Sequence, residues 1–370
     1  MKSMPTLNRY QRGLSIIELM IALLLGSLLT VGMVQIFTSN SQAFQMSEAI
    51  ARSQEYGRIA SEMLSREVRG AGYYGCNGQS VANNLAVEEG DANWDLYDYA
   101  GGPAVSSLDQ WRPAAAIDGT DILHFSGMES SGIEIYTDEP PTAASTRVSS
   151  RSGRGPASEL SNDDIIAITD CQGTDVVQIS NIQGDGEDLE VTLVTNSGGG
   201  SQVPGNDFSD NVCSNTGNAG AGNNCLSNDY GIGAQILKPY KRTYFIGPSS
   251  VRGGEPALKM VEYKGASSTT FEVVEGVIDL QVRYGLSSDP DQAVSSWKEA
   301  DNMQTSDWDL VRSARVSLLV RGGPDHLFDD KARVCFPAWT DCSAGDNYTA
   351  TDNRMYRVYS FTTNVRNKSS

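Results

Sequence analysis

The sequence predicts an α+β protein in which a long N-terminal helix packs on an antiparallel, β-rich C-terminal domain with long, disulfide-braced loops. Three observations lead to this fold class. An apolar run spans residues 19–37, apolar residues at helical spacing continue to residue 68, and short alternating runs fill most of the chain beyond residue 120. Helices repeat every 3.6 residues and strands every two, so the two patterns can be told apart.

The first half of the predicted helix has the length and composition of a membrane span. About 19 apolar residues form a helix about 29 Å long, close to the thickness of a hydrocarbon core. Lys2, Arg9 and Arg12 precede the run, whereas mixed charges follow it. The positive-inside rule therefore predicts a single-pass protein with a cytoplasmic N-terminus and its remaining domain outside.

Glu18 stands at the head of the apolar run and is the only charged residue between Arg12 and Glu48. A carboxylate inside a bilayer costs about 2.5–3.5 kcal/mol or more, so such a residue usually has a partner. One interpretation is a plain single-pass anchor, in which Glu18 lies among the headgroups or is protonated.

The second half of the helix is predicted to be amphipathic and to pack on the protein's own sheet rather than in a coiled coil, because its stripe lasts little more than three heptads. Gly57 is a weak point, and Gly70-Ala71-Gly72 is a glycine-rich stop. The stripe consists of Met46, Ala49, Ile50, Tyr56, Ile59, Ala60, Met63, Leu64 and Val68. The predicted segments are a leader (1–13), a transmembrane helix (14–38), its amphipathic continuation (39–72) and a globular domain (73–370).

Alternating apolar runs in the globular domain predict strands. They span residues 121–125, 133–136, 165–169, 175–179, 189–194, 241–246, 258–263, 270–274, 277–284, 311–320 and 357–362. Two segments rich in small polar residues, 140–160 and 196–229, are predicted to be long surface loops.

The six cysteines all lie outside the membrane in this topology, and an even number there indicates disulfides. Fifteen pairings of six cysteines are possible. Proximity favours Cys213–Cys225 and Cys335–Cys342, which leaves Cys76–Cys171. A zinc site is not expected, because the chain has no C-x-x-C and only His326 is near a cysteine.

Composition and missing motifs argue against several functions. A net charge of −18 disfavours direct binding to nucleic acid, and the densest basic group (Arg312, Arg315 and Arg321) is interpreted as solvated strand faces. His124 and His326 are the only histidines, both predicted to be structural, and no nucleophile elbow, zinc-protease motif or phosphate loop is present. We therefore do not expect an enzyme.

One acidic segment could hold a metal ion. Asp185, Glu187 and Asp188 offer clustered oxygen ligands of the type that Ca²⁺ prefers. The segment lacks the spacing of an EF-hand and has the composition of a hairpin turn, which is the favoured interpretation. No cofactor is expected apart from this possible Ca²⁺ site.

The string Gly13-Leu14-Ser15-Ile16-Ile17-Glu18 resembles the type III leader of type IV pilins and pseudopilins. The resemblance implies that prepilin peptidase cuts between Gly13 and Leu14, that the amine of Leu14 is N-methylated, and that the hydrophobic helix is retained. It also implies that Glu18 pairs with the N-terminal ammonium of a neighbouring subunit. Leu14 departs from the family, in which Phe is usual, and the kinking proline of major pilins is absent.

Further stretches resemble PilW-type minor pilins, namely residues 66–76, 274–285, 311–321 and 359–367. They include the helix end Arg66-Glu67-Val68-Arg69-Gly70-Ala71-Gly72-Tyr73-Tyr74-Gly75-Cys76. This resemblance implies an inner-membrane protein that joins other minor pilins and the major pilin in the priming and tip complex of a type IV pilus. Prepilin peptidase/N-methyltransferase and the inner-membrane assembly platform are the other implied partners; twitching motility and adhesion are implied at family level.

Two other functions stay open. A pseudopilin of a type II secretion system would share the leader and the paired strands. A membrane-tethered adhesin or ligand-binding domain would instead use the loops 140–160 and 196–229 to contact a surface or glycan.

Overall fold

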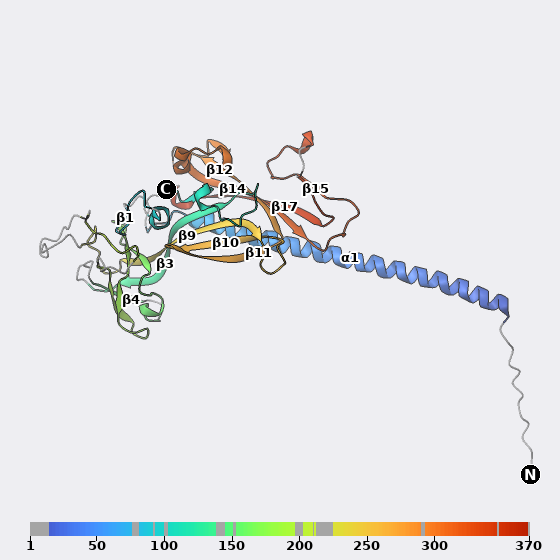
Figure 1. Cartoon of the computed structure of the whole chain (residues 1–370), viewed down its shortest axis with the longest axis horizontal. Helices are drawn as coiled ribbons and strands as arrows, with labels where there is room; N and C mark the ends of the chain where they lie inside the picture. Colours follow the sequence, from blue (N-terminus) through green and yellow to red (C-terminus); the bar gives the residue numbers. More distant parts are fainter. Residues whose placement is uncertain are drawn as a thin grey trace, which may run out of the picture.

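The structure is a computed structural model. The structure describes residues 15–75, 81–91, 93–99, 103–137, 145–150, 153–196, 203–209, 211, 225–289, 293–345 and 348–368. One helix, α1 (Ile16–Gly70), is 55 residues long and projects far beyond a β-rich domain at its other end (Figure 1). The predicted fold class is confirmed.

Helix α1 runs without a break through Gly57 and stops at the predicted glycine-rich segment. The amide of Ala71 donates to the carbonyl of Glu67 at 2.9 Å, and Gly72 then takes a left-handed conformation with φ of 74°. Glycine adopts this conformation without the steric cost that a side chain would add. The chain thereby turns out of the helix and into the domain.

The larger sheet holds eleven strands within the described residues, in the order β1-β6-β5-β9-β3-β4-β8-β7, with β10 and β11 extending from β9 and β2 pairing with β3. All its pairs are antiparallel except β1 with β6. Its strands are β1 (Val81–Asn83), β2 (Val105–Ser106), β3 (Leu123–Ile135), β4 (Thr146–Ser150), β5 (Ile165–Thr169), β6 (Thr174–Gln178), β7 (Asn181–Gln183), β8 (Glu190–Val194), β9 (Gln235–Pro248), β10 (Pro256–Lys264) and β11 (Ser267–Glu275).

The smaller sheet is antiparallel and has the order β13-β12-β14-β17. Its strands are β12 (Val277–Leu286), β13 (Ser296–Glu299), β14 (Val311–Gly322) and β17 (Met355–Asn364), and a separate pair is formed by β15 (Arg333–Val334) and β16 (Tyr348–Thr349). Short helical segments are α2 (Trp94–Tyr97), η1 (Asp109–Trp111), η2 (Pro156–Ser158), η4 (Ala300–Asn302), η5 (Thr305–Leu310), η6 (Cys342–Ala344) and η7 (Arg366–Lys368).

The second half of α1 packs on these sheets, as the amphipathic stripe predicts. Its buried face consists of Ala49, Ser53, Gly57, Ala60, Leu64, Glu67 and Val68. Small residues in this stripe let the strands approach α1 closely. At Gly57 the ring of Tyr359 on β17 is so near that an added Cβ would lie 2.4 Å from it. The main core joins Leu64 and Val68 to Phe125 of β3 and Leu318 of β14. The helix is therefore part of the domain core over this half.

The structure corrects several strand boundaries. The predicted strands 121–125 and 133–136 form one strand, β3, because β9 pairs with it along nearly its whole length. Seven short strands were not predicted, namely β1, β2, β4, β7, β13, β15 and β16. Six of the seven have four residues or fewer, too few for a periodicity to be seen, and β4 lies in a segment rich in small polar residues.

The prediction of one long loop over 140–160 is wrong in part. Residues Thr146–Ser150 form β4, which pairs with β3 and β8 and buries Thr146 and Val148 completely. Of the loop 196–229, residues 197–202, 210 and 212–224 lie outside the described residues. Phe208 and Leu226, in its described parts, are buried in a core of the larger sheet.

Candidate functional site

The first half of α1 exposes apolar side chains on every side. Each large apolar residue from Ile16 to Phe37 is at least 52% exposed, and Phe44 is still 71% exposed. Among the described residues this helix alone is long and apolar enough to cross a membrane. An apolar surface of this size requires lipid or another protein to cover it. The first buried residue on the helix is Ala49, so the exposed segment and the domain are separated by about three turns.

Glu18 lies in the first turn of this exposed half. The amide of Ser15 donates a hydrogen bond to its Oε2 at 3.2 Å, so the carboxylate caps its own helix within one protomer. The N-terminus of a helix carries a partial positive charge and unpaired amides, which favour a carboxylate there. Gly13 and Leu14, the residues of the predicted cleavage, lie outside the described residues.

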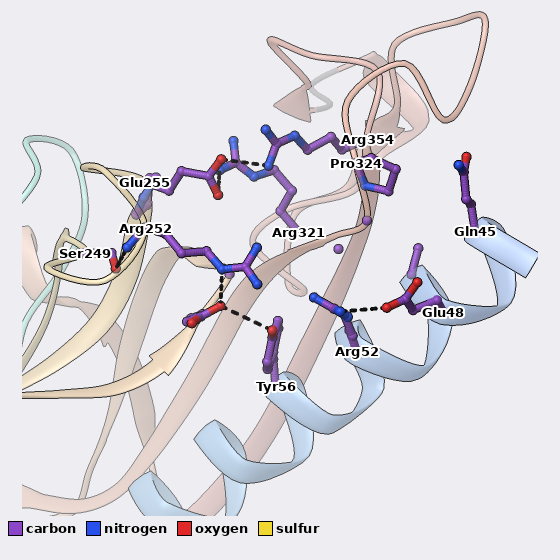
Figure 2. A pocket seen from close by; sticks show the side chains of 16 residues that line it. Gln45, Glu48, Arg52, Tyr56, Ser249, Arg252, Glu255, Arg321, Pro324 and Arg354 are labelled. Atoms are coloured by element: carbon purple, nitrogen blue, oxygen red, sulfur yellow. Dashed lines mark hydrogen bonds and ion pairs between the residues drawn. The ribbon is translucent and has the colours of Figure 1, made fainter.

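A pocket of about 410 Å³ lies where α1 leaves the domain; we call it the helix-exit pocket. Figure 2 shows the side chains of α1 on one side and those of the strand ends on the other. Its lining comprises Gln45, Glu48, Ala49, Arg52, Tyr56, Ser249, Arg252, Glu255, Pro256, Glu275, Gly276, Arg321, Gly322, Gly323, Pro324 and Arg354. The pocket is thus built from α1, the β9–β10 turn and the ends of β11, β14 and β17.

Glycines bring the end of β14 against the helix at this pocket. A Cβ on Gly322 would lie 2.7 Å from the carbonyl oxygen of Ala49, a distance that a side chain could not occupy without moving the backbone. Gly323 has φ of 81° and approaches the same alanine. The close approach closes the wall of the pocket and leaves the charged side chains around its mouth.

Ion pairs line the helix-exit pocket. Arg52 pairs with Glu48 at 2.6 Å, and Arg252 pairs with Glu275 at 2.7 Å. Tyr56 donates to the same Glu275 carboxylate at 3.4 Å, which links the helix to β11. Because Arg52 and Arg252 are about half exposed, each pair adds at most about 1 kcal/mol to stability.

Arg321 corrects one sequence interpretation. It was expected on a solvated strand face, but its side chain is only 13% exposed. It pairs with Glu255 at 3.3 Å and Asp352 at 3.1 Å, while Arg354 shares the Glu255 carboxylate at 3.0 Å. This arrangement fixes the turn before β10 against the end of β14.

A polar cluster around the buried Glu67 joins the end of α1 to the larger sheet and was not predicted. Arg242 of β9 pairs with Glu129 at 2.5 Å, Glu262 at 3.0 Å and Glu67 of α1 at 3.7 Å. Tyr244 also donates to Glu67 at 3.2 Å. Burial raises the pKa of the Glu67 carboxyl above its usual range, an effect that the Arg242 charge partly offsets. The partners are far apart in the sequence, so no local pattern indicates them.

The two histidines differ. His124 is buried, stacks on Trp111 with ring centroids 4.0 Å apart, and has a pKa well below the usual value because burial disfavours its charged form. Lys241 lies beside it; burial lowers its pKa to about 8, and its ammonium donates to the carbonyl oxygens of Asp95 and Asp98. His326 is exposed, in a turn next to Asp325. No site gathers the two histidines.

The structure forms the Cys335–Cys342 disulfide, with Cα atoms 5.8 Å apart. Cys171 and Cys225 are also disulfide-bonded. Cys76 and Cys213, their predicted partners, lie outside the described residues, so both pairings stay predictions.

The acidic segment forms a tight turn. The amide of Asp185 donates to a carboxylate oxygen of Asp188 at 2.8 Å, and the Asp188 amide returns a bond to the Asp185 carbonyl at 3.0 Å. Glu187 is exposed beside them. Within the described residues no three His, Cys, Asp or Glu side chains are placed to hold a metal ion.

Comparison with known proteins gives two family matches. Residues 8–34 match the prokaryotic N-terminal methylation motif, and residues 243–367 match Type IV Pilus-assembly protein W. The second match covers about a third of the chain, including the whole smaller sheet. No curated protein and no solved structure matches the chain.

Proposed function

We propose that this protein, which its two family matches support as a PilW-type minor pilin, joins other minor pilins and the major pilin in the priming and tip complex of a type IV pilus. One observation carries the proposal. The same helix is exposed and apolar in its first half and packed into the core of the domain in its second half. Such a helix can pass from lipid to a bundle of like helices while the domain stays folded.

The membrane stage follows from the helix and the leader. Before assembly the exposed half of α1 would span the inner membrane, with its N-terminus in the cytoplasm and the domain in the periplasm. Prepilin peptidase would then cut between Gly13 and Leu14 and methylate the new amine. Cleavage on this side keeps the helix attached to the domain.

The assembly stage gives Glu18 its role. Within one protomer its carboxylate has the amide of Ser15 as a partner. In the assembled helix bundle we expect it to meet the ammonium of a neighbour's Leu14. A buried pair of this kind fixes register more reliably than it adds stability, because desolvation offsets much of the attraction.

The test combines processing with assembly in the native host. Mass spectrometry of the membrane-extracted chain should find N-methylated Leu14 as its first residue. Replacing Glu18→Ala should remove most surface pili, whereas Glu62→Ala should not, because Glu62 lies on the solvent side of the same helix with its side chain 73% exposed. An unprocessed chain that supports normal numbers of pili would refute the proposal.

A further inference from the structure

The larger sheet ends in a strand whose outer edge pairs with no other strand in the described part of the chain. β11 pairs on one side with β10. Its first five residues, Ser267-Ser268-Thr269-Thr270-Phe271, are exposed, and Phe271 is 45% exposed. Figure 1 shows β9, β10 and β11 in succession. An edge of this kind presents amide and carbonyl groups that can pair with a strand of another chain.

The other described edge strands are protected. β1, β2, β7 and β13 have two to four residues each, and β17 lies against α1, with Thr363 hydrogen-bonded to Ser65 at 2.9 Å. Short strands and covering helices are usual means of preventing unwanted pairing, as are charges and prolines on the edge. β11 has nine residues, and its exposed stretch contains no charge and no proline. Among the edge strands that the structure describes, β11 is therefore the exception.

The hairpin geometry identifies the outward groups. Lys264 and Ser267 pair across a two-residue hairpin turn. The two residues that flank such a turn form a hydrogen-bonded pair in the usual hairpin geometry. Along an antiparallel ladder, residues alternate between bonding the partner strand and facing away from it. Ser268 and Thr270 are therefore the residues whose amides and carbonyls face outward.

We propose that the β11 edge receives an extended strand from a different subunit of the pilus, which would continue the larger sheet across the subunit boundary. The inference rests on the proposed function. A second copy of this chain is disfavoured as the partner, because two copies that each carry a net charge of −18 would repel one another. The added strand would run toward Glu275, which Tyr56 of α1 contacts at 3.4 Å. The new pairing would therefore adjoin the helix that enters the bundle.

The first test removes an outward amide. Thr270→Pro deletes one amide donor on the free edge and leaves the hydrogen bonds between β11 and β10 in place. Edge strands tolerate proline at positions whose amide faces away from the neighbouring strand. Losing one or two strand hydrogen bonds to a partner should reduce pili per cell about tenfold at an unchanged amount of the protein. Thr270→Val keeps the amide and should leave pili at wild-type numbers. Normal pili in the proline strain would overturn the inference.

The second test does not depend on the proline variant folding. A photo-cross-linking residue at position 268 of the full chain should link to an extended segment of another pilus subunit. The same residue at position 181, on the short edge strand β7, should not. Links only to a second copy of this chain, or none, would overturn the inference. The Glu18→Ala strain distinguishes failure of this inference from failure of the proposed function. If Glu18→Ala leaves the number of pili normal, the proposed function itself fails.

Discussion

The two halves of α1 share one helix and differ in what surrounds them. Leu24 in the first half is 60% exposed, whereas Leu64 in the second half is completely buried between two sheets. Their glutamates differ in the same way, because Glu18 is exposed and Glu67 is packed against Arg242 and Tyr244. The first half is left for another molecule to cover, and the second is already covered by this chain. Equivalent substitutions in the two halves should therefore have different effects.

The largest difference is expected for leucine. Leu64→Ala should destabilise the domain by about 2–5 kcal/mol, because it leaves a cavity in the main core. Leu24→Ala should change stability by less than about 0.5 kcal/mol, because that side chain packs on nothing in the domain. Thermal unfolding of the full chain in detergent, followed by near-ultraviolet circular dichroism, measures both. Equal effects would show that the two halves are not distinct.

Glycine substitutions in the two halves of α1 should differ less in their effect on stability than the leucine substitutions do. Gly57→Ala places a methyl group 2.4 Å from the Tyr359 ring, a clash that should cost about 1–3 kcal/mol before a gain in helix propensity of about 1 kcal/mol is subtracted. Gly32→Ala meets nothing within 4 Å. The same unfolding assay should place only the first variant below the wild type. A more stable Gly57→Ala chain would mean that Tyr359 moves aside freely.

The smallest expected effect is the pH dependence of the stability that Glu67 contributes. Because burial raises the pKa of Glu67 in the folded state, the native protein holds a proton that the unfolded chain releases once the pH passes the ordinary value for glutamate. The contribution of Glu67 to stability therefore falls as pH rises through that interval, up to the folded pKa. Glu67→Gln should flatten this fall and leave Arg242 its pairs with Glu129 and Glu262.

Glu62→Gln is the control for this prediction, since the Glu62 side chain is 73% exposed. Its unfolding temperature should follow the wild-type pH profile. If the Glu67→Gln variant loses stability faster than the wild type over the same interval, the carboxylate is stabilised by Arg242 more than it is penalised by burial, and the sign of the prediction is wrong.

The long helix, its stop and most strands were predictable because they depend on local patterns. The apolar run, the stripe ending at Val68 and the Gly70-Ala71-Gly72 segment place α1 within a residue or two of where it lies. β5 was predicted at its observed bounds, since five apolar and β-branched residues lie between polar turns. These signals need no knowledge of distant residues.

The remaining features depend on residues that meet only in the folded chain. β4 lies in a segment rich in serine and arginine, and only its pairing with β3 and β8 buries Val148. The helix-exit pocket draws on α1, β14 and three other segments, so none of them alone indicates it. The Glu67–Arg242 contact likewise joins the end of α1 to β9, and neither segment has a sequence pattern that indicates the other as its partner.

The continuity of α1 through Gly57 has a mechanical consequence. A helix of 55 residues without a hinge transmits tension along its axis instead of bending. Because its buried face lies along strands of both sheets, a pull along the helix axis would load this contact in shear, with many side chains resisting at once. A domain held in this way should withstand an axial pull that would detach a domain joined to the helix through a flexible tether.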